Sequence, residues 1–73
     1  MMAQRIEIKV KSTGWTYGFH NVTRFRFKDA KAMRLQGHDT KNHEMFLEIT
    51  FYNEFTDTFE EFYFPVDDIE ISC

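Results

Sequence analysis

Residues 42–73 read NHEMFLEITFYNEFTDTFEEFYFPVDDIEISC, and their charge differs from that of everything before them. This segment has nine acids and no Lys or Arg, whereas residues 1–41 have all nine bases and three acids, so the two parts carry −9 and +6 and sum to −3. Such a charge asymmetry is typical of proteins that interact with charged partners. It is equally typical of basic early strands that pair with acidic late strands, since each opposite-charge pair stabilises a sheet by about 0.2–1 kcal/mol.

The acidic segment alternates between apolar and polar residues, and this period of two indicates β-strands. The clearest predicted strand is 44–52, in which every odd-numbered residue is apolar. Residues 53–57 have turn chemistry, and 58–64 then form a strand with rings on both faces. A strand with apolar residues on both faces is either covered on both sides or presents one side to a partner.

The end of the segment is punctuated by Pro65, which has no backbone donor and therefore ends a strand or lies at a sheet edge. We expect one 3₁₀ turn over 66–68 and a last short strand around Ile69 and Ile71. Before the acidic segment, residues 5–11 alternate as a half-buried strand.

Residues 15–27 read as one long strand or two short ones, with a bulge or bend at 20–23 where the alternation is lost. Residues 28–30 are expected to form a tight turn. The next six residues, Lys31–Gln36, contain good helix formers but no recognised cap, so we predict a strand there with Met33 and Leu35 pointing inward.

Five or six antiparallel strands with short connections predict an all-β protein, with one small domain over residues 1–73. The strands are best buried as a single antiparallel sheet rolled into an SH3-like or OB-like barrel or half-barrel. The order of a long hairpin, a one-turn connector and a terminal strand resembles the layout of SH3-like barrels, although no diagnostic family motif is present.

Other features bear on the compartment. Cys73 is the only cysteine, the N-terminus has no apolar signal region, and no apolar run is long enough to span a membrane. These features predict a cytoplasmic protein.

Aromatic residues exceed what one small core normally uses, with nine Phe, three Tyr and one Trp in 73 residues. Some of these rings are therefore expected on the surface, where they favour a partner-binding or self-association interface. We accordingly predict a homodimer or higher oligomer.

The leading functional interpretation is a non-catalytic binding or inhibitor protein that docks on a basic protein partner and mimics the charge of a nucleic acid. In size and composition it resembles small acidic inhibitors such as phage anti-restriction and anti-CRISPR proteins. The predicted partner-binding residues form an acidic, aromatic strand face: Glu44, Phe46, Glu48, Tyr52, Phe59, Glu61 and Tyr63.

Two alternatives remain open. Arg24, Arg26 and Lys28 share one face of a strand and would grip the phosphates of a nucleic acid. A homo-oligomer that sequesters a small ligand would instead use a pocket between subunits, lined by Trp15, Tyr17 and His20.

Neither an enzyme nor a metal or cofactor site is predicted. The neighbouring acids Glu60 and Glu61 point to opposite faces of a strand and cannot act together as an acid–base pair. His38 and His43 lie near acids in one polar loop, but two histidines without cysteines are a weak match for a zinc site.

Overall fold

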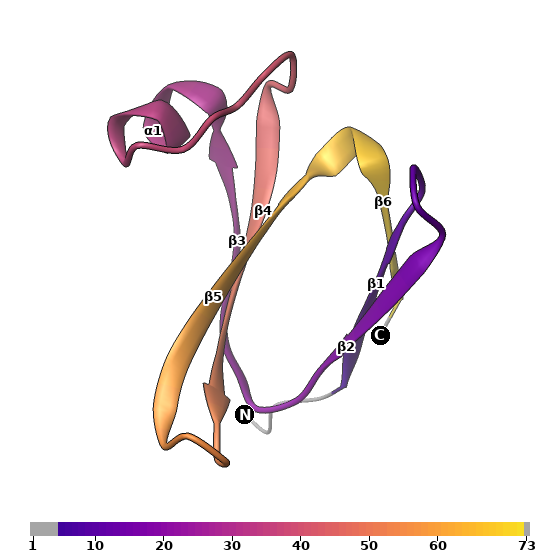
Figure 1. Ribbon diagram of the computed structural model, residues 1–73, viewed down its shortest axis with the longest axis vertical. Coiled ribbons are helices and arrows are strands. Elements are labelled where there is room, and N and C mark those ends of the chain that lie inside the picture. The colour runs from indigo at the N-terminus through magenta and orange to yellow at the C-terminus, as the bar shows by residue number, and fades with distance from the viewer. Residues whose placement is uncertain (1–4, 73) are drawn as a thin grey trace.

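Two three-stranded antiparallel sheets form the protein, as shown by a computed structural model that describes residues 5–72 (Figure 1). The first sheet has the order β2-β1-β6, with β1 at Ile6–Val10, β2 at Trp15–Phe19 and β6 at Ile69–Ser72. Residues 11–14 join β1 and β2 in a turn.

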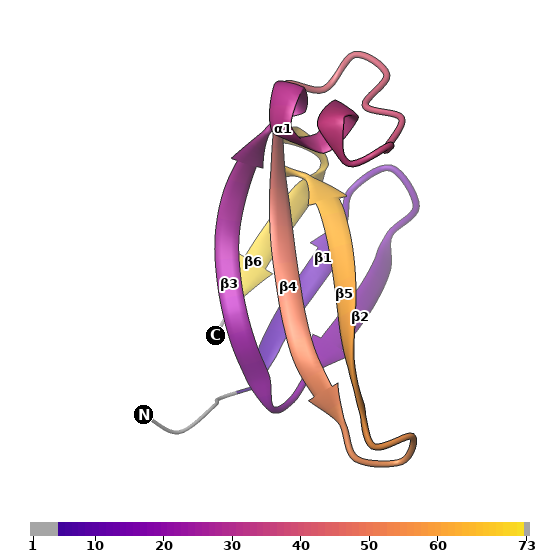
Figure 2. The ribbon, with the colours of Figure 1, turned by 90° about the vertical axis from the view of Figure 1, so that its left-hand side faces the viewer.

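The second sheet is a meander with the order β3-β4-β5. Its strands are β3 at Val22–Asp29, β4 at Met45–Asn53 and β5 at Thr58–Pro65. The helix α1, Ala30–Leu35, lies between β3 and β4, and the 3₁₀ turn η1, Val66–Asp68, leads from β5 to β6. Figures 1 and 2 place α1 at one end of this sheet and the β4–β5 turn at the other.

The core lies where the two sheets face each other (Figure 2). Ile8 and Phe19 of the first sheet pack with Leu47, Ile49 and Phe64 of the second, and all five are buried. Because side chains alternate along a strand, Leu47 and Ile49 of β4 both enter this core and Phe51 packs against it. Each fully buried side chain of this kind contributes roughly 1.5–3 kcal/mol.

The predicted all-β architecture is confirmed, and six strands agree with the predicted five or six, but the single rolled sheet is wrong. Within residues 5–72 the strands form two separate sheets and no closed barrel. The break lies at Asn21, whose left-handed backbone (φ 58°) separates the end of β2 from the start of β3. The predicted irregularity is therefore present, with a register shift between Val22 and Arg24, but it sends the chain into another sheet.

The predicted strand at Lys31–Gln36 is wrong, because these residues belong largely to α1. The Asp29 carboxylate is the missing cap: it accepts a 2.8 Å hydrogen bond from the backbone N–H of Ala32. Met33 is buried as expected, but Leu35 points into solvent, since residues two apart lie on different sides of a helix.

The helix ends in a well-formed terminating motif. Gly37 has a left-handed backbone (φ 88°), and its N–H donates to the Arg34 carbonyl at 2.9 Å. The N–H of His38 donates to the Met33 carbonyl at 3.1 Å, which completes the paired bonds of a Schellman motif. Six residues are enough for a helix here because both ends are capped.

The C-terminal part follows the sequence prediction closely. β5 ends at Pro65, residues 66–68 form the 3₁₀ turn, and a short strand follows. Asp68 fastens this connection to the β1–β2 turn, because its carboxylate accepts hydrogen bonds from the Ser12 N–H at 3.0 Å and the Ser12 hydroxyl at 2.7 Å. The predictions made for Met1–Gln4 and Cys73 concern residues outside the described range.

Replacing Asp29 by Ala should destabilise the protein by about 1 kcal/mol, because the N-terminus of α1 loses its side-chain acceptor. Urea unfolding followed by circular dichroism measures this change. Asp29→Asn should retain nearly all of the stability, since Asn is also a good N-cap. Equal losses for Asp29→Ala and Asp29→Asn would contradict the capping role.

Candidate functional site

The β4–β5 hairpin ends in an exposed group of rings and carboxylates, which we call the acidic–aromatic tip. Phe55 lies in the turn and is 94% exposed, and Phe59 near the start of β5 is 65% exposed. The turn holds Phe55 outward because the Asn53 side chain accepts a 3.0 Å hydrogen bond from its backbone N–H. The tip comprises Tyr52, Glu54, Phe55, Asp57 and Phe59.

Tyr52 connects the aromatic and acidic parts of the tip. Its ring contacts that of Phe59 edge-on, with centroids 5.4 Å apart. Its hydroxyl donates a hydrogen bond to the Asp57 carboxylate. This bond, together with partial burial and the nearby Glu54, raises the pKa of Tyr52 above its ordinary value. The Tyr52 hydroxyl therefore keeps its proton at neutral pH and stays hydrogen-bonded to Asp57.

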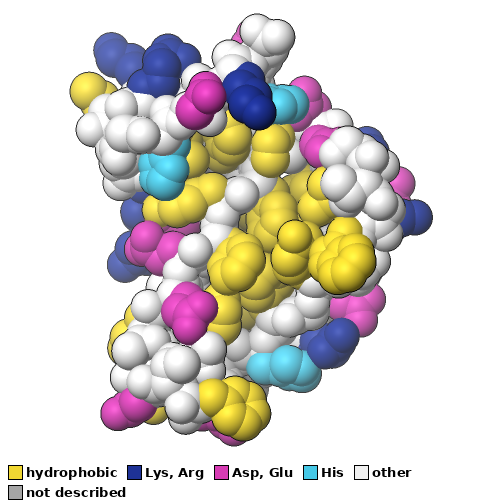
Figure 3. Space-filling view, in the orientation of Figure 1, with side chains coloured by type: hydrophobic (Ala, Val, Ile, Leu, Met, Phe, Trp, Pro, Cys, Tyr) yellow, Lys and Arg dark blue, Asp and Glu magenta, His cyan; other side chains and the backbone are white. Residues whose placement is uncertain are grey.

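A shallow hollow of about 510 Å³ lies beside the tip. Its walls come from the β2–β3 connection and the β4–β5 hairpin, and they are residues 18–21 and 51–55. Asn21 holds the two walls together, since its carbonyl accepts a 3.1 Å hydrogen bond from the Tyr52 N–H. In Figure 3, apolar and acidic side chains meet at the lower end of the molecule, where Figure 1 places the β4–β5 turn.

The structure divides the predicted partner-binding residues. Phe46 and Glu48 are buried, so they cannot contact a partner directly, and this part of the prediction needs correction. Phe59 and Glu61 are exposed, and Tyr52 and Tyr63 are half-buried. Glu44 is exposed just before β4, at the end of that strand away from the tip, and its carbonyl accepts a 2.8 Å hydrogen bond from the Ala30 N–H of α1.

Three residues of the tip are absent from the sequence prediction: Glu54, Phe55 and Asp57. The sequence shows them only as turn chemistry between two strands. The sequence signal that would predict the tip is Phe55 inside a four-residue turn that is otherwise polar. A ring in a turn at the end of a hairpin has few residues to pack against, so it is expected to be exposed.

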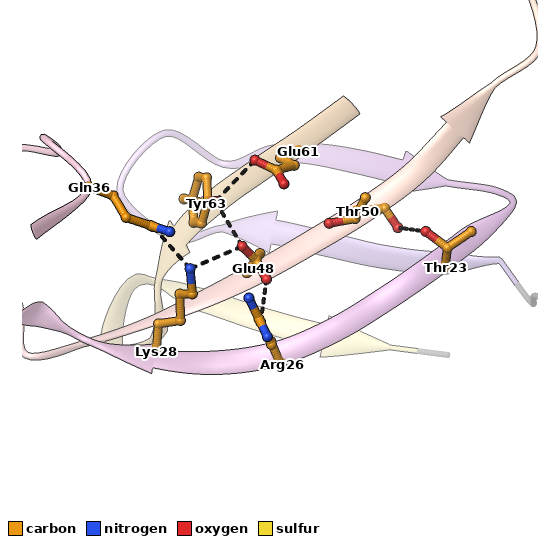
Figure 4. A network of polar contacts seen from close by, with 8 residues as sticks. All are labelled: Thr23, Arg26, Lys28, Gln36, Glu48, Thr50, Glu61 and Tyr63. Carbon is orange, nitrogen blue, oxygen red and sulfur yellow. Dashed lines mark hydrogen bonds and ion pairs between the residues drawn. The ribbon is translucent and has the colours of Figure 1, made fainter. Parts of the chain in front are cut away.

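Glu48 is buried because side chains of the neighbouring strands cover it. It lies opposite Arg26 of β3 and Tyr63 of β5 in one cross-strand row and is 1% exposed. Its carboxylate pairs with Arg26 Nε at 2.5 Å and Lys28 Nζ at 3.4 Å, and it accepts a 2.8 Å hydrogen bond from the Tyr63 hydroxyl (Figure 4). Alternation along β4 does place Glu48 on the side away from the core, but that side is not open.

Residues around this carboxylate extend the network. Lys28 also donates to the Gln36 side chain at 2.9 Å, and its ammonium lies 5.8 Å from the centre of the Tyr63 ring. Burial alone would raise the pKa of Glu48, but hydrogen bonds from Tyr63, Arg26 and Lys28 outweigh it and hold the pKa below 4.5. Burial and the Glu48 carboxylate raise the pKa of Tyr63.

The basic face of β3 is thus largely paired with the buried carboxylate of Glu48. Arg26 and Lys28 share Glu48, whereas Arg24 is exposed and has no ion pair among the described side chains. The three bases do lie on one face of β3, as the sequence predicts.

The predicted ligand residues do not come together. Trp15 is exposed at the start of β2, Tyr17 packs against Phe64 with centroids 5.4 Å apart, and His20 follows the end of β2. His20 lines the hollow beside the tip, where Arg5 Nη1 lies 2.8 Å from its Nε2.

The two histidines of the polar loop have separate partners. The His38 ring packs on Tyr63, with centroids 4.7 Å apart, and His43 Nδ1 lies 2.8 Å from an Asp67 carboxylate oxygen. They do not face a common point.

Comparisons with protein-family models, curated proteins and solved structures gave no match for this chain. Within residues 5–72, no helix has the length and hydrophobicity needed to cross a bilayer.

Glu48 should make folding stability depend on pH. Because its folded pKa is lowered, its contribution is present above its unfolded pKa of about 4.5 and is lost as the pH falls through the folded pKa. Glu48→Gln should cost on the order of 3 kcal/mol at neutral pH, since it leaves Lys28 without its charged partner. Urea unfolding of both proteins between neutral and acidic pH should show this difference shrinking below about pH 4.5. The exposed Glu44→Gln is the control, and a difference for Glu48→Gln that is constant with pH would contradict the assignment.

Thr50 offers a stabilising substitution. Its hydroxyl is buried and has no hydrogen-bond partner among the described residues. Thr50→Val keeps the shape of the side chain and removes the unpaired oxygen, so it should raise the free energy of unfolding by about 1 kcal/mol. Thr23→Val is the matched control, because Thr23 donates a 3.3 Å hydrogen bond to the Thr50 carbonyl and should not gain stability. A loss of stability in Thr50→Val would show that the hydroxyl is satisfied.

Proposed function

We propose that this protein is a non-catalytic binding protein that docks through the acidic–aromatic tip on a basic surface of another protein. The observation that carries the proposal is the near-complete exposure of Phe55, beside the exposed ring of Phe59 and the carboxylates of Glu54 and Asp57. The acidic segment that forms this hairpin contains no Lys or Arg.

The two components of the tip have different roles in binding. Exposed aromatic rings that become buried supply much of the affinity of an interface, and each such anchor is typically worth 2 kcal/mol or more. Carboxylates around the rings attract a basic surface during diffusion and mainly raise the association rate. The hollow beside the tip gives the partner a concave surface into which one of its own side chains fits.

An inhibitory action is supported by the same charges. A surface rich in carboxylates occupies a basic groove that otherwise binds phosphates, so the protein would compete with a nucleic acid for such a groove. The meander, the 3₁₀ connector and the return of β6 to β1 support an SH3-like arrangement of the strands as the scaffold for this tip. This likeness concerns strand order alone and does not by itself indicate a function.

The alternatives from the sequence receive less support. For nucleic-acid binding, Glu48 already neutralises part of the charge of Arg26 and Lys28. For ligand sequestration, Trp15 and His20 lie at opposite ends of β2.

The test is affinity capture of host proteins by the wild type and by variants. Phe55→Ser should reduce capture of a specific partner at least about tenfold, the change expected when an anchor of 1.4 kcal/mol or more is lost. Leu35→Ser is the matched control, because Leu35 is equally apolar and exposed but lies on α1 at the other end of the molecule.

Charge reversal tests the second component. Glu54→Lys should slow association with the captured partner and weaken its salt dependence, whereas Glu70→Lys on β6 should change neither. Identical partner sets and rates for the wild type and the two tip variants would overturn the proposal.

A further inference from the structure

Among residues 5–72, the strand β3 is an edge of the second sheet, because the order β3-β4-β5 leaves it with β4 as its neighbour on one side. It has eight residues, which is long for an exposed edge. An open edge of this length presents a row of unpaired backbone donors and acceptors, which proteins usually cover or use for pairing.

One face of this edge is apolar. Phe25 and Phe27 lie opposite Ile49 and Leu47 and therefore point to the same side as the core, yet they are 39% and 52% exposed. Their rings contact each other edge-on, with centroids 6.0 Å apart. Met45, the next apolar residue on this side of β4, is also exposed. The two rings thus lie on the core side of the sheet, but at its edge, where solvent reaches them.

The other face of the same edge is basic. Arg24, Arg26 and Lys28 alternate with the two rings along β3 and lie opposite Thr50, Glu48 and Phe46 of β4. Glu48 is the one acid of β4 in these rows, so this face of β3 and β4 carries three bases and one acid, a net charge of +2.

The simplest explanation is that the bases prevent edge-to-edge aggregation, since charged side chains on edge strands discourage such pairing. This accounts for one face of β3 but leaves the exposed rings of Phe25 and Phe27 unexplained. The same bases also disfavour pairing of this edge with a second copy of the protein. The β3 strand of a second copy would place Arg and Lys side chains next to their own kind, which destabilises an antiparallel pair.

We propose that β3 binds an extended segment of a partner polypeptide in which apolar and acidic residues alternate, and that this segment joins the sheet as an added strand. The apolar side chains of the segment would cover Phe25 and Phe27, and its acidic side chains would face Arg24 and Arg26. Only a strand matches this edge, because its side chains alternate between faces with the same period as those of β3. Backbone hydrogen bonds provide part of the affinity of such strand addition, and the side-chain pattern provides the specificity.

The probe is a fluorescent peptide of eight residues, as many as β3 has, with Val and Glu in alternation. Fluorescence anisotropy should show saturable binding, and amide NMR shifts should locate the peptide at residues 22–29. Replacing Glu by Lys in the peptide, or methylating its backbone nitrogens on the side that faces β3, should weaken binding at least about tenfold. Equal binding of the methylated peptide would overturn strand addition.

Variants of the protein complete the test. Arg24→Glu should weaken peptide binding at least about tenfold, whereas Lys31→Glu, the same charge change on α1, should weaken it less than about threefold. Phe27→Ser should also weaken binding, and circular dichroism checks that each variant is folded. A single-stranded oligothymidine that binds residues 22–29 more tightly than the peptide would overturn the proposal in favour of a nucleic acid. Self-association through β3 that excludes the peptide would overturn it in favour of a second copy.

This inference is independent of the proposed function. Phe55→Ser should leave peptide binding unchanged, and Arg24→Glu should leave capture through the acidic–aromatic tip unchanged. Failure at one surface therefore does not count against the other.

Discussion

The Glu48 carboxylate is the constraint on which the second sheet depends. It lies between β3 and β5, binds Arg26 and Lys28 on one side and accepts a hydrogen bond from Tyr63 on the other. A carboxylate with almost no exposure is stable only with such partners, since an unpaired buried charge costs several kcal/mol. This one residue joins the basic early part of the chain to the acidic late part. It thereby pairs with two of the three bases of β3, whereas Arg24 at the same edge has no ion pair among the described side chains.

Most of the fold was predictable from the alternation of apolar residues, and the errors have specific causes. The strand boundaries around Pro65 and the 3₁₀ turn follow from local chemistry alone. The helix α1 was missed because Asp29 reads equally well as a turn residue and as an N-cap, and only the hydrogen bond to Ala32 distinguishes the two. The division into two sheets depends on the left-handed backbone of Asn21, a conformation that Asn favours but that its presence in a sequence does not dictate.

The candidate site was predictable in character but not in position. The absence of bases after Lys41 and the surplus of rings indicate an acidic, aromatic surface. Alternation then assigned Phe46 and Glu48 to it, because a period of two separates the faces of a strand but does not say whether a face is open. Their burial is set by the side chains of β3 and β5 in the same cross-strand rows, and that register is a long-range property. Phe55, at the centre of the tip, follows no periodicity at all.

The placement of α1 and the β4–β5 turn at opposite ends separates the bases of α1 from the carboxylates of the tip along the 33 Å length of the molecule (Figure 1). Lys31 and Arg34 lie at one end, whereas Glu54 and Asp57 lie at the other. At physiological ionic strength a charge is screened within about 8 Å, so the charges at the two ends do not influence each other. In about 0.01 M salt the screening length rises to roughly 30 Å, comparable with the whole protein. In dilute buffer the field of the tip carboxylates would therefore extend over much of the protein, and a partner bound at the tip would respond to charges at both ends.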